Sequence, residues 1–194
     1  MAEDLRRAVW AAYSDAAADP ERAHPFPVGR AFAQGLGYTA DALEGVPECS
    51  VEAFTGVSNV AFFADLSAGD TVLDLGCGAG LDSLIAARRV GNTGRVVGVD
   101  FSQLMLDRAR CGAQAACVRN LALVLADGER LPLASGSIDV ALVNGIFNLN
   151  PAREAIFAEL ARVLRPGGSV FGAELVLREP ARTPPELDRL HWFA

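Results

Sequence analysis

Residues 74–80 read DLGCGAG, a glycine-rich segment between the apolar run TVLDL (Thr71–Leu75) and a helix-like stretch over residues 80–90. Glycine lets a backbone turn tightly and approach a ligand at a point where a Cβ atom would collide with it. A plain strand-to-helix turn that is rich in glycine is the alternative interpretation. The segment predicts a strand, a loop that faces a ligand, and a helix, in that order.

The alternation of apolar runs and amphipathic stretches continues along the chain. We expect the later strands at Arg95–Asp100, Leu121–Leu125, Ile138–Asn144 and residues 169–177. Ser102 is expected to cap one helix, and Asn150 and Pro151 to begin another that ends at RPGG (165–168). Strands that are apolar on both faces and alternate with helices indicate a parallel sheet covered on both sides. The prediction is an α/β fold with a Rossmann-like, doubly wound, mostly parallel sheet.

Residues 1–65 have a broken helical pattern with turn signals at HPFPVG (24–29), GLGY (35–38) and EGVPE (44–48). This segment is too short for a separate core, so we predict a helical flap over 1–65 and a ligand-binding domain over 66–194. After the fifth strand we expect only a proline-rich link and one helix over 185–194. The sheet would then lack the last strands usual for such a domain. Its fifth strand would be an exposed edge that a homodimer or another partner covers, unless the chain is a fragment.

The chain has 194 residues, 51% of them hydrophobic, and a formal net charge of −7. The acidic balance argues against nucleic-acid and membrane-surface partners. No apolar run reaches the roughly 20 residues that span a bilayer, and the N-terminus lacks the apolar core of a signal peptide. The four cysteines have neither CxxC nor zinc-ligand spacing. These features predict a cytoplasmic protein without a metal site.

The charge near the glycine segment indicates the class of ligand. A dinucleotide fingerprint that begins at Gly76 would need glycine or alanine where Leu81 stands, and a pyrophosphate would sit poorly beside Asp74. A Walker phosphate loop is excluded because the chain has no lysine. A cationic ligand fits better, and S-adenosylmethionine carries sulfonium and ammonium groups. An NAD-type oxidoreductase is the weaker alternative.

Four segments in order resemble the class I S-adenosylmethionine-dependent methyltransferases over residues 67–177. They are DLGCGAG (74–80), VVGVDFS (96–102), LADGERLPL (125–133) and VLRPGG (163–168). Within that superfamily, GLGY, EGVPE, SAGDTVLDLG (67–76) and NGIFNLNP (144–151) are most similar to the arsenite methyltransferase-like subgroup. The resemblance implies S-adenosylmethionine as cofactor and S-adenosylhomocysteine as product.

The resemblance also implies roles for residues of the first two motifs. The loop would hold the methionine part of the cofactor with Gly76, Cys77, Gly78 and Gly80. Asp74 would lie near its ammonium group, and Asp100 would accept hydrogen bonds from both ribose hydroxyls, since a carboxylate fits a diol bidentately. Phe101 and Met105 would flank the adenine. The alternatives are a solvated turn aspartate for Asp100 and core packing for Phe101 and Met105.

The later motifs supply the rest of the implied cofactor site. Asp127, with the backbone of Gly128 and Glu129, would read the adenine amino group. Asn144 would line the reaction centre beside the methyl group, and Ile146 is a second residue expected there. The pattern names no catalytic residue.

The acceptor is where the chain departs from the subgroup. The subgroup binds trivalent arsenic through cysteine thiolates, which suit a soft metalloid. Two of its cysteines align with Val57 and Gly145, and Cys49 alone cannot supply such a site. The asparagine-proline-proline-aromatic signature of nucleic-acid amino methyltransferases is also missing, so we expect a different small-molecule acceptor.

Methyl transfer is an in-line displacement, and orientation alone can supply about 7–11 kcal/mol of the barrier reduction. Such an enzyme can work without a dedicated base; within the flap, His24 and Tyr38 are the residues that could serve as one. The alternative function is an inactive cofactor-binding protein or a subunit completed by a partner.

Overall fold

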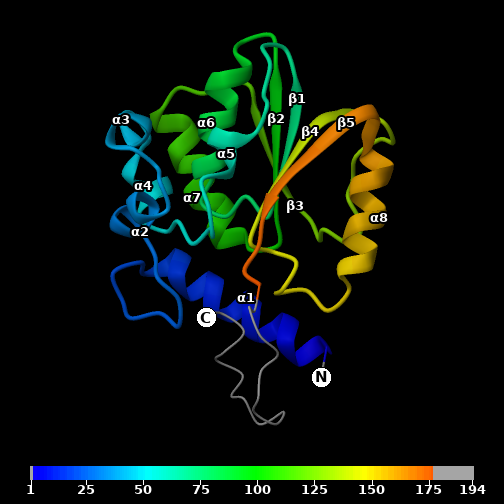
Figure 1. Ribbon diagram of the computed structural model, residues 1–194. Coiled ribbons are helices and arrows are strands. Elements are labelled where there is room, and N and C mark those ends of the chain that lie inside the picture. Colours follow the sequence, from blue (N-terminus) through cyan, green and yellow to red (C-terminus); the bar gives the residue numbers. More distant parts are fainter. Residues whose placement is uncertain (1, 177–194) are drawn as a thin grey trace.

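The computed structural model describes residues 2–176, and its centre is a five-stranded parallel sheet (Figure 1). The strands lie in the order β3-β2-β1-β4-β5, and every neighbouring pair is parallel. Their bounds are Thr71–Leu75 (β1), Arg95–Asp100 (β2), Leu121–Leu125 (β3), Ile138–Asn144 (β4) and Leu164–Ala173 (β5). The predicted Rossmann-like sheet is confirmed, and the first four strands have the expected bounds.

Helices cover both faces of this sheet (Figure 1). Helices α6 (Leu81–Val90) and α7 (Gln103–Ala115) lie on one face, and α8 (Arg153–Val163) lies on the other. Alternate strand residues face opposite sides, so Val72 packs toward α6 while Leu73 packs toward α8. The Ser102 side chain accepts a hydrogen bond from the N–H of Met105 at 3.4 Å, which confirms the predicted cap of α7.

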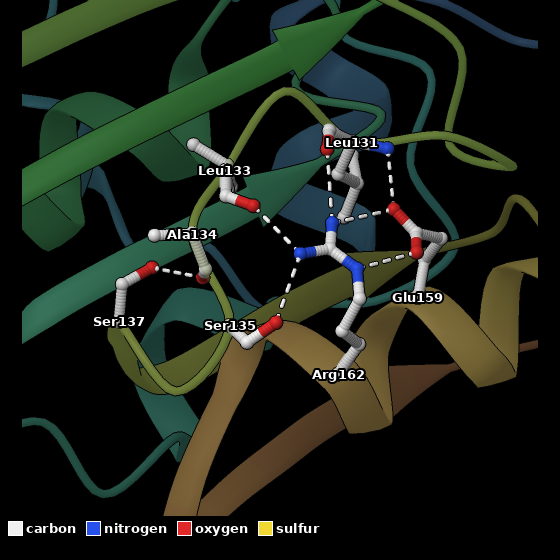
Figure 2. Close-up of polar contacts among 7 residues, drawn as sticks. All are labelled: Leu131, Leu133, Ala134, Ser135, Ser137, Glu159 and Arg162. Carbon is white, nitrogen blue, oxygen red and sulfur yellow. Dashed lines mark hydrogen bonds and ion pairs between the residues drawn. The ribbon is translucent and has the colours of Figure 1, made fainter.

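The connection between β3 and β4 contains no helix, and two side chains of α8 hold it in place (Figure 2). Arg162 donates to the carbonyl oxygens of Leu131 at 2.9 Å and Leu133 at 2.7 Å. Glu159 accepts the N–H of Leu131 at 2.6 Å and pairs with Arg162 at 2.6 Å. The hydrogen bond from Arg162 lowers the pKa of Glu159 to about 2. This polar link adds to the hydrophobic packing of Leu131 and Leu133 against the core.

The start of α8 and the bounds of β5 differ from the prediction. The helix begins at Arg153 with Ala152 as its N-cap, because Asn150 accepts the N–H of Ala152 at 2.7 Å in the turn before it. Strand β5 begins immediately after α8 and includes the RPGG segment, with a register shift opposite Ile138 and Val140. A left-handed Gly167 (φ 83°) allows this irregular pairing.

In the described sheet, β5 lies at one edge, as predicted, and its residues are half-buried or exposed. The predicted helix over 185–194 lies outside the described residues. The homodimer across this edge stays a prediction.

Residues 2–65 form five helices that lie along two sides of the sheet domain (Figure 1). Helix α1 lies across the end of the sheet where the strands finish, and the short helices lie beside α6 and α7. Residues of the short helices and of the turns between them share one hydrophobic cluster with α6 and the sheet, in which Tyr38 and Leu43 are 1% exposed. The bounds are Ala2–Ala18 (α1), Arg30–Gly35 (α2), Ala40–Leu43 (α3), Glu48–Val51 (α4) and Val60–Phe63 (α5).

Two features are absent from the residues that the structure describes. No helix among them is long and apolar enough to cross a membrane. Residues 2–176 also contain no group of three or more His, Cys, Asp or Glu side chains placed to hold a metal ion. The division at residue 65 and the cytoplasmic location stay predictions.

Candidate functional site

The glycine loop leaves β1 and is tied to the end of β2. The N–H groups of Gly76 and Cys77 both donate to the carbonyl oxygen of Val99, at 2.8 and 3.0 Å. Gly76 is left-handed (φ 74°), and a Cβ atom there would collide with Cγ2 of Ile146. This position therefore requires glycine on two separate grounds, conformation and space.

Asp100 joins the end of β2 to the same loop. One carboxylate oxygen accepts the N–H of Gly78 at 2.8 Å, and the other accepts the N–H of Ser102 at 2.8 Å. Burial raises the pKa of Asp100 to about 6, although these backbone hydrogen bonds act in the opposite direction. The carboxylate is thus oriented by the loop and by the start of α7, and each oxygen keeps further acceptor capacity.

Two more buried carboxylates, Asp74 and Asp82, lie beside the loop. The Ser83 hydroxyl donates to Asp74 at 2.5 Å. Burial and, to a smaller extent, the nearby charge of Asp82 together raise the pKa of Asp74 to about 8. Burial also raises the pKa of Asp82. Within residues 2–176, no ion pair links either carboxylate, or that of Asp100, to an arginine.

Asn144, at the end of β4, connects the sheet to the N-terminal segment. Its side-chain oxygen accepts the N–H groups of Val57 at 2.8 Å and Ser58 at 3.1 Å. Its amide nitrogen donates to the carbonyl oxygen of Ser58 at 2.7 Å and to Asp82 at 2.8 Å. The Tyr38 hydroxyl also donates to Asp82, at 2.6 Å. Asn144 therefore acts as a clamp whose polar atoms are all engaged by the protein.

A pocket opens at this end of the sheet and brings most of the predicted residues together. Ten of them line it: Asp74, Gly76, Cys77, Gly78, Asp100, Phe101, Asp127, Gly128, Asn144 and Ile146. Phe101 is 42% exposed, so its ring is available to a ligand.

Three predicted residues do not line the pocket. Gly80 is the left-handed N-cap of α6, where a Cβ atom would lie 2.9 Å from Cβ of Ala109. Met105 is buried in a hydrophobic cluster, and Glu129 accepts a hydrogen bond from Asn150 at 3.0 Å. The two flap residues, His24 and Tyr38, are also outside the pocket lining.

The N-terminal segment supplies pocket residues that the sequence pattern did not reveal. Helix α1 contributes Arg6, Val9 and Tyr13, and the chain after α4 contributes a further wall that includes Phe54. Arg6 forms ion pairs with Asp127 and, at 3.0 Å, with Glu129. The predicted adenine-reading carboxylate is thus paired with α1. Helical periodicity indicates that a helix buries one face, but not which surface it covers.

A family profile described as a methyltransferase domain matches residues 72–168, half of the chain. The chain belongs to this family. The predicted resemblance to class I S-adenosylmethionine-dependent methyltransferases is confirmed, and the matched region contains the glycine loop, Asp100, Asp127 and Asn144.

Individual relatives agree with this assignment. The chain is 37% identical over 153 residues to an arsenite methyltransferase from Halobacterium salinarum, covering 79% of this chain and 39% of the relative. It is 36% identical over 111 residues to a demethylmenaquinone methyltransferase from Oceanobacillus iheyensis, covering 57% and 46%. The crystal structure of an arsenic(III) S-adenosylmethionine methyltransferase from Chlamydomonas reinhardtii matches with a TM-score of 0.62 and 34% identity, covering 67% and 46%. The chain spans less than half of the length of each of these relatives.

Proposed function

We propose that this methyltransferase domain binds S-adenosylmethionine in the pocket and transfers its methyl group to a small-molecule acceptor, releasing S-adenosylhomocysteine. The observation that carries the proposal is the group of buried carboxylates Asp74, Asp82 and Asp100 beside the glycine loop, without an arginine partner in the described chain. Burying carboxylates without a cation is costly, and a cationic ligand would offset that cost. A pyrophosphate coenzyme would increase it.

The residues present fit such a cofactor. Asp100 would hold the ribose hydroxyls, since its oxygens are already oriented by Gly78 and Ser102. The Gly76 backbone would approach the methionine part, and Phe101 would stack against the adenine. When bound, the cofactor supplies a methyl carbon attached to a positively charged sulfur. Asp74, which is buried, would neutralise positive charge on the cofactor.

The chemistry needs orientation more than proton transfer. Neither His24 nor Tyr38 lines the pocket, and burial and the charge of Asp100 raise the pKa of Tyr13, which does line it. Tyr13 would therefore stay protonated and serve as a hydrogen-bond donor. The pocket residues would hold the acceptor in line with the leaving sulfur, an effect worth about 7–11 kcal/mol when alignment is good.

We further propose that the acceptor is not arsenite. The two positions aligned with subgroup cysteines are neighbours here: a Cβ atom on Gly145 would lie 2.9 Å from Cγ1 of Val57. Neither position carries a thiol, so the place where two thiolates would meet is apolar. The alternative of an inactive cofactor-binding subunit is not favoured, because the matched relatives are named methyltransferases.

Calorimetry with purified chain tests the proposal. We expect saturable binding of S-adenosylmethionine and S-adenosylhomocysteine, and binding at least about tenfold weaker in Asp100→Asn, a loss of about 1.4 kcal/mol. The matched control is Asp107→Asn, which changes an exposed carboxylate on α7 and should leave the affinity unchanged. Thermal unfolding of both variants checks that they fold. Absence of heat with S-adenosylmethionine, together with tight binding of NAD, would overturn the proposal.

A further inference from the structure

Two of the four cysteines lie together outside the pocket, on helices that pack against each other. Cys49 is in α4, half-buried, and Cys111 is in α7, exposed. The residues beside them are in direct contact: a Cβ atom on Gly112 would lie 3.3 Å from Cβ of Ser50 and would collide with the Ser50 hydroxyl. Close approach of the two helices therefore depends on glycine at this position.

A second contact fixes the same pair of helices from the other side. Arg108, one turn before Cys111, donates to the backbone carbonyl of Cys49 at 3.5 Å and pairs with Glu52. Burial, together with the smaller effect of the nearby Cys111 thiol, raises the pKa of Cys49 to about 11. The Ser50–Gly112 and Arg108–Cys49 contacts thus hold the two cysteine-bearing segments close together.

We propose that Cys49 and Cys111 form a reversible intrachain disulfide that links the N-terminal segment to α7. A disulfide requires Cα atoms within about 7 Å and Cβ atoms that face each other. The close approach of Ser50 and Gly112, the residues next to the two cysteines, supports this geometry. A two-ligand metal site is the weaker interpretation, because the described residues offer no third His, Cys, Asp or Glu ligand there.

Hydrogen peroxide can oxidise the two thiols to the disulfide in two steps. The thiolate of the exposed Cys111 attacks one peroxide oxygen, the O–O bond breaks, and the leaving hydroxide takes up the proton that the thiol had released, so that a sulfenic acid and one water form. The Cys49 sulfur then attacks the Cys111 sulfur, forming the S–S bond and releasing a second water. The two thiols lose two electrons in all, and hydrogen peroxide accepts them. A dithiol reductant returns both thiols.

The disulfide would join α4, which borders the pocket, to α7 of the sheet domain. Ser50, next to Cys49, lines the pocket, and α7 follows directly from Asp100 through its cap Ser102. A bond between α4 and α7 would therefore hold the N-terminal wall of the pocket against the sheet domain. The thiol chemistry itself does not depend on the proposed methyl transfer, so the two can fail separately.

Mass spectrometry of the whole chain tests the disulfide without any cofactor. Reduced protein is treated with hydrogen peroxide, remaining thiols are alkylated, and the protein is cleaved after Arg and Glu, since Glu52 separates Cys49 from Cys77. We expect a cross-linked pair of peptides containing Cys49 and Cys111, lighter by two hydrogens, that a dithiol reductant separates. Because no arginine separates Cys111 from Cys117, the mapping is repeated in Cys117→Ser.

The variants make the result decisive. Cys117→Ser is the matched control, because Cys117 is also exposed and follows the same helix, and it should form the cross-link as the natural chain does. Cys111→Ser and Cys49→Ser should not form it. A Cys111–Cys117 bond, cross-links between chains only, or Cys111 oxidised to a sulfinic acid while Cys49 stays free would each overturn the proposal.

Discussion

Replacing Asn144 by alanine should detach the N-terminal segment from the end of β4. The side chain makes four hydrogen bonds, to Val57, twice to Ser58, and to Asp82. Each bond contributes about 1 kcal/mol net, and each buried group left without a partner costs about 1–3 kcal/mol. Because the site is half-buried, water can replace part of the loss, and we expect a decrease of about 3–5 kcal/mol in the free energy of unfolding.

Asn144→Asp distinguishes the hydrogen bonds that the side-chain oxygen accepts from those that the amide donates. The acid keeps the oxygen that accepts the N–H groups of Val57 and Ser58, but it places a second oxygen against Asp82 in place of the donating amide. The loss of stability should therefore grow as pH rises and both carboxyl groups ionise. Asn92→Ala, in an exposed loop, is the control and should change stability by less than about 0.5 kcal/mol.

Urea denaturation followed by circular dichroism measures these changes. A loss of about 3–5 kcal/mol is a large part of the roughly 5–15 kcal/mol that stabilises a typical domain, so the midpoint should fall clearly. Asn144→Ala within about 1 kcal/mol of the natural chain would refute the reasoning, since the four bonds could not then hold the segment.

Three other changes have expected outcomes. The cofactor-free chain should lose stability from about pH 4 to pH 8, because Asp74, with its pKa raised to about 8, keeps a proton that the unfolded chain releases. Linkage then lowers the unfolding free energy by up to about 1.4 kcal/mol per pH unit. Thermal unfolding across this range checks the slope, which Asp74→Asn should reduce most above pH 6, where Asp100 has already ionised; an unchanged slope between pH 6 and pH 8 would contradict the assignment. Arg6→Ala should strengthen S-adenosylmethionine binding a few-fold in calorimetry, because it frees Asp127, whereas Arg7→Ala should not; weaker binding would count against the adenine role. Arg162→Ala should lower the midpoint of urea denaturation, since it removes three hydrogen bonds to the β3–β4 connection, and an unchanged midpoint would show that this connection is held by other contacts.

The sheet was predictable because its strands are apolar on both faces and short. The bounds of β1 to β4 match the sequence patterns, and the glycine loop follows β1 as expected. Strand β5 was placed too late, because RPGG is typical of a turn and only pairing with β4 shows that it continues the sheet. Local sequence cannot reveal that partner.

The parts of the site that lie within one sequence motif could be predicted. The parts formed by segments that are distant in sequence could not. Asp100 and the glycine loop lie within one βαβ unit, whose geometry is constant. Asp82 was missed because an acid in the first turn of a helix ordinarily interacts with solvent and the helix dipole. Its burial depends on Tyr38 and Asn144, which lie far away in sequence. The Arg6 contact with Asp127 was missed for the same reason.

The Asn144 clamp also bears on how this protein can be divided. An expression boundary at residue 66 would follow the change in sequence pattern. It would, however, remove Tyr38, which donates to the Asp82 carboxylate, and Ser58, whose carbonyl oxygen accepts from the Asn144 amide. It would also uncover the outer surfaces of α6 and α7, which the short helices shield from water. A trimmed product should precipitate or unfold, because the piece removed supplies part of the interior of the piece retained.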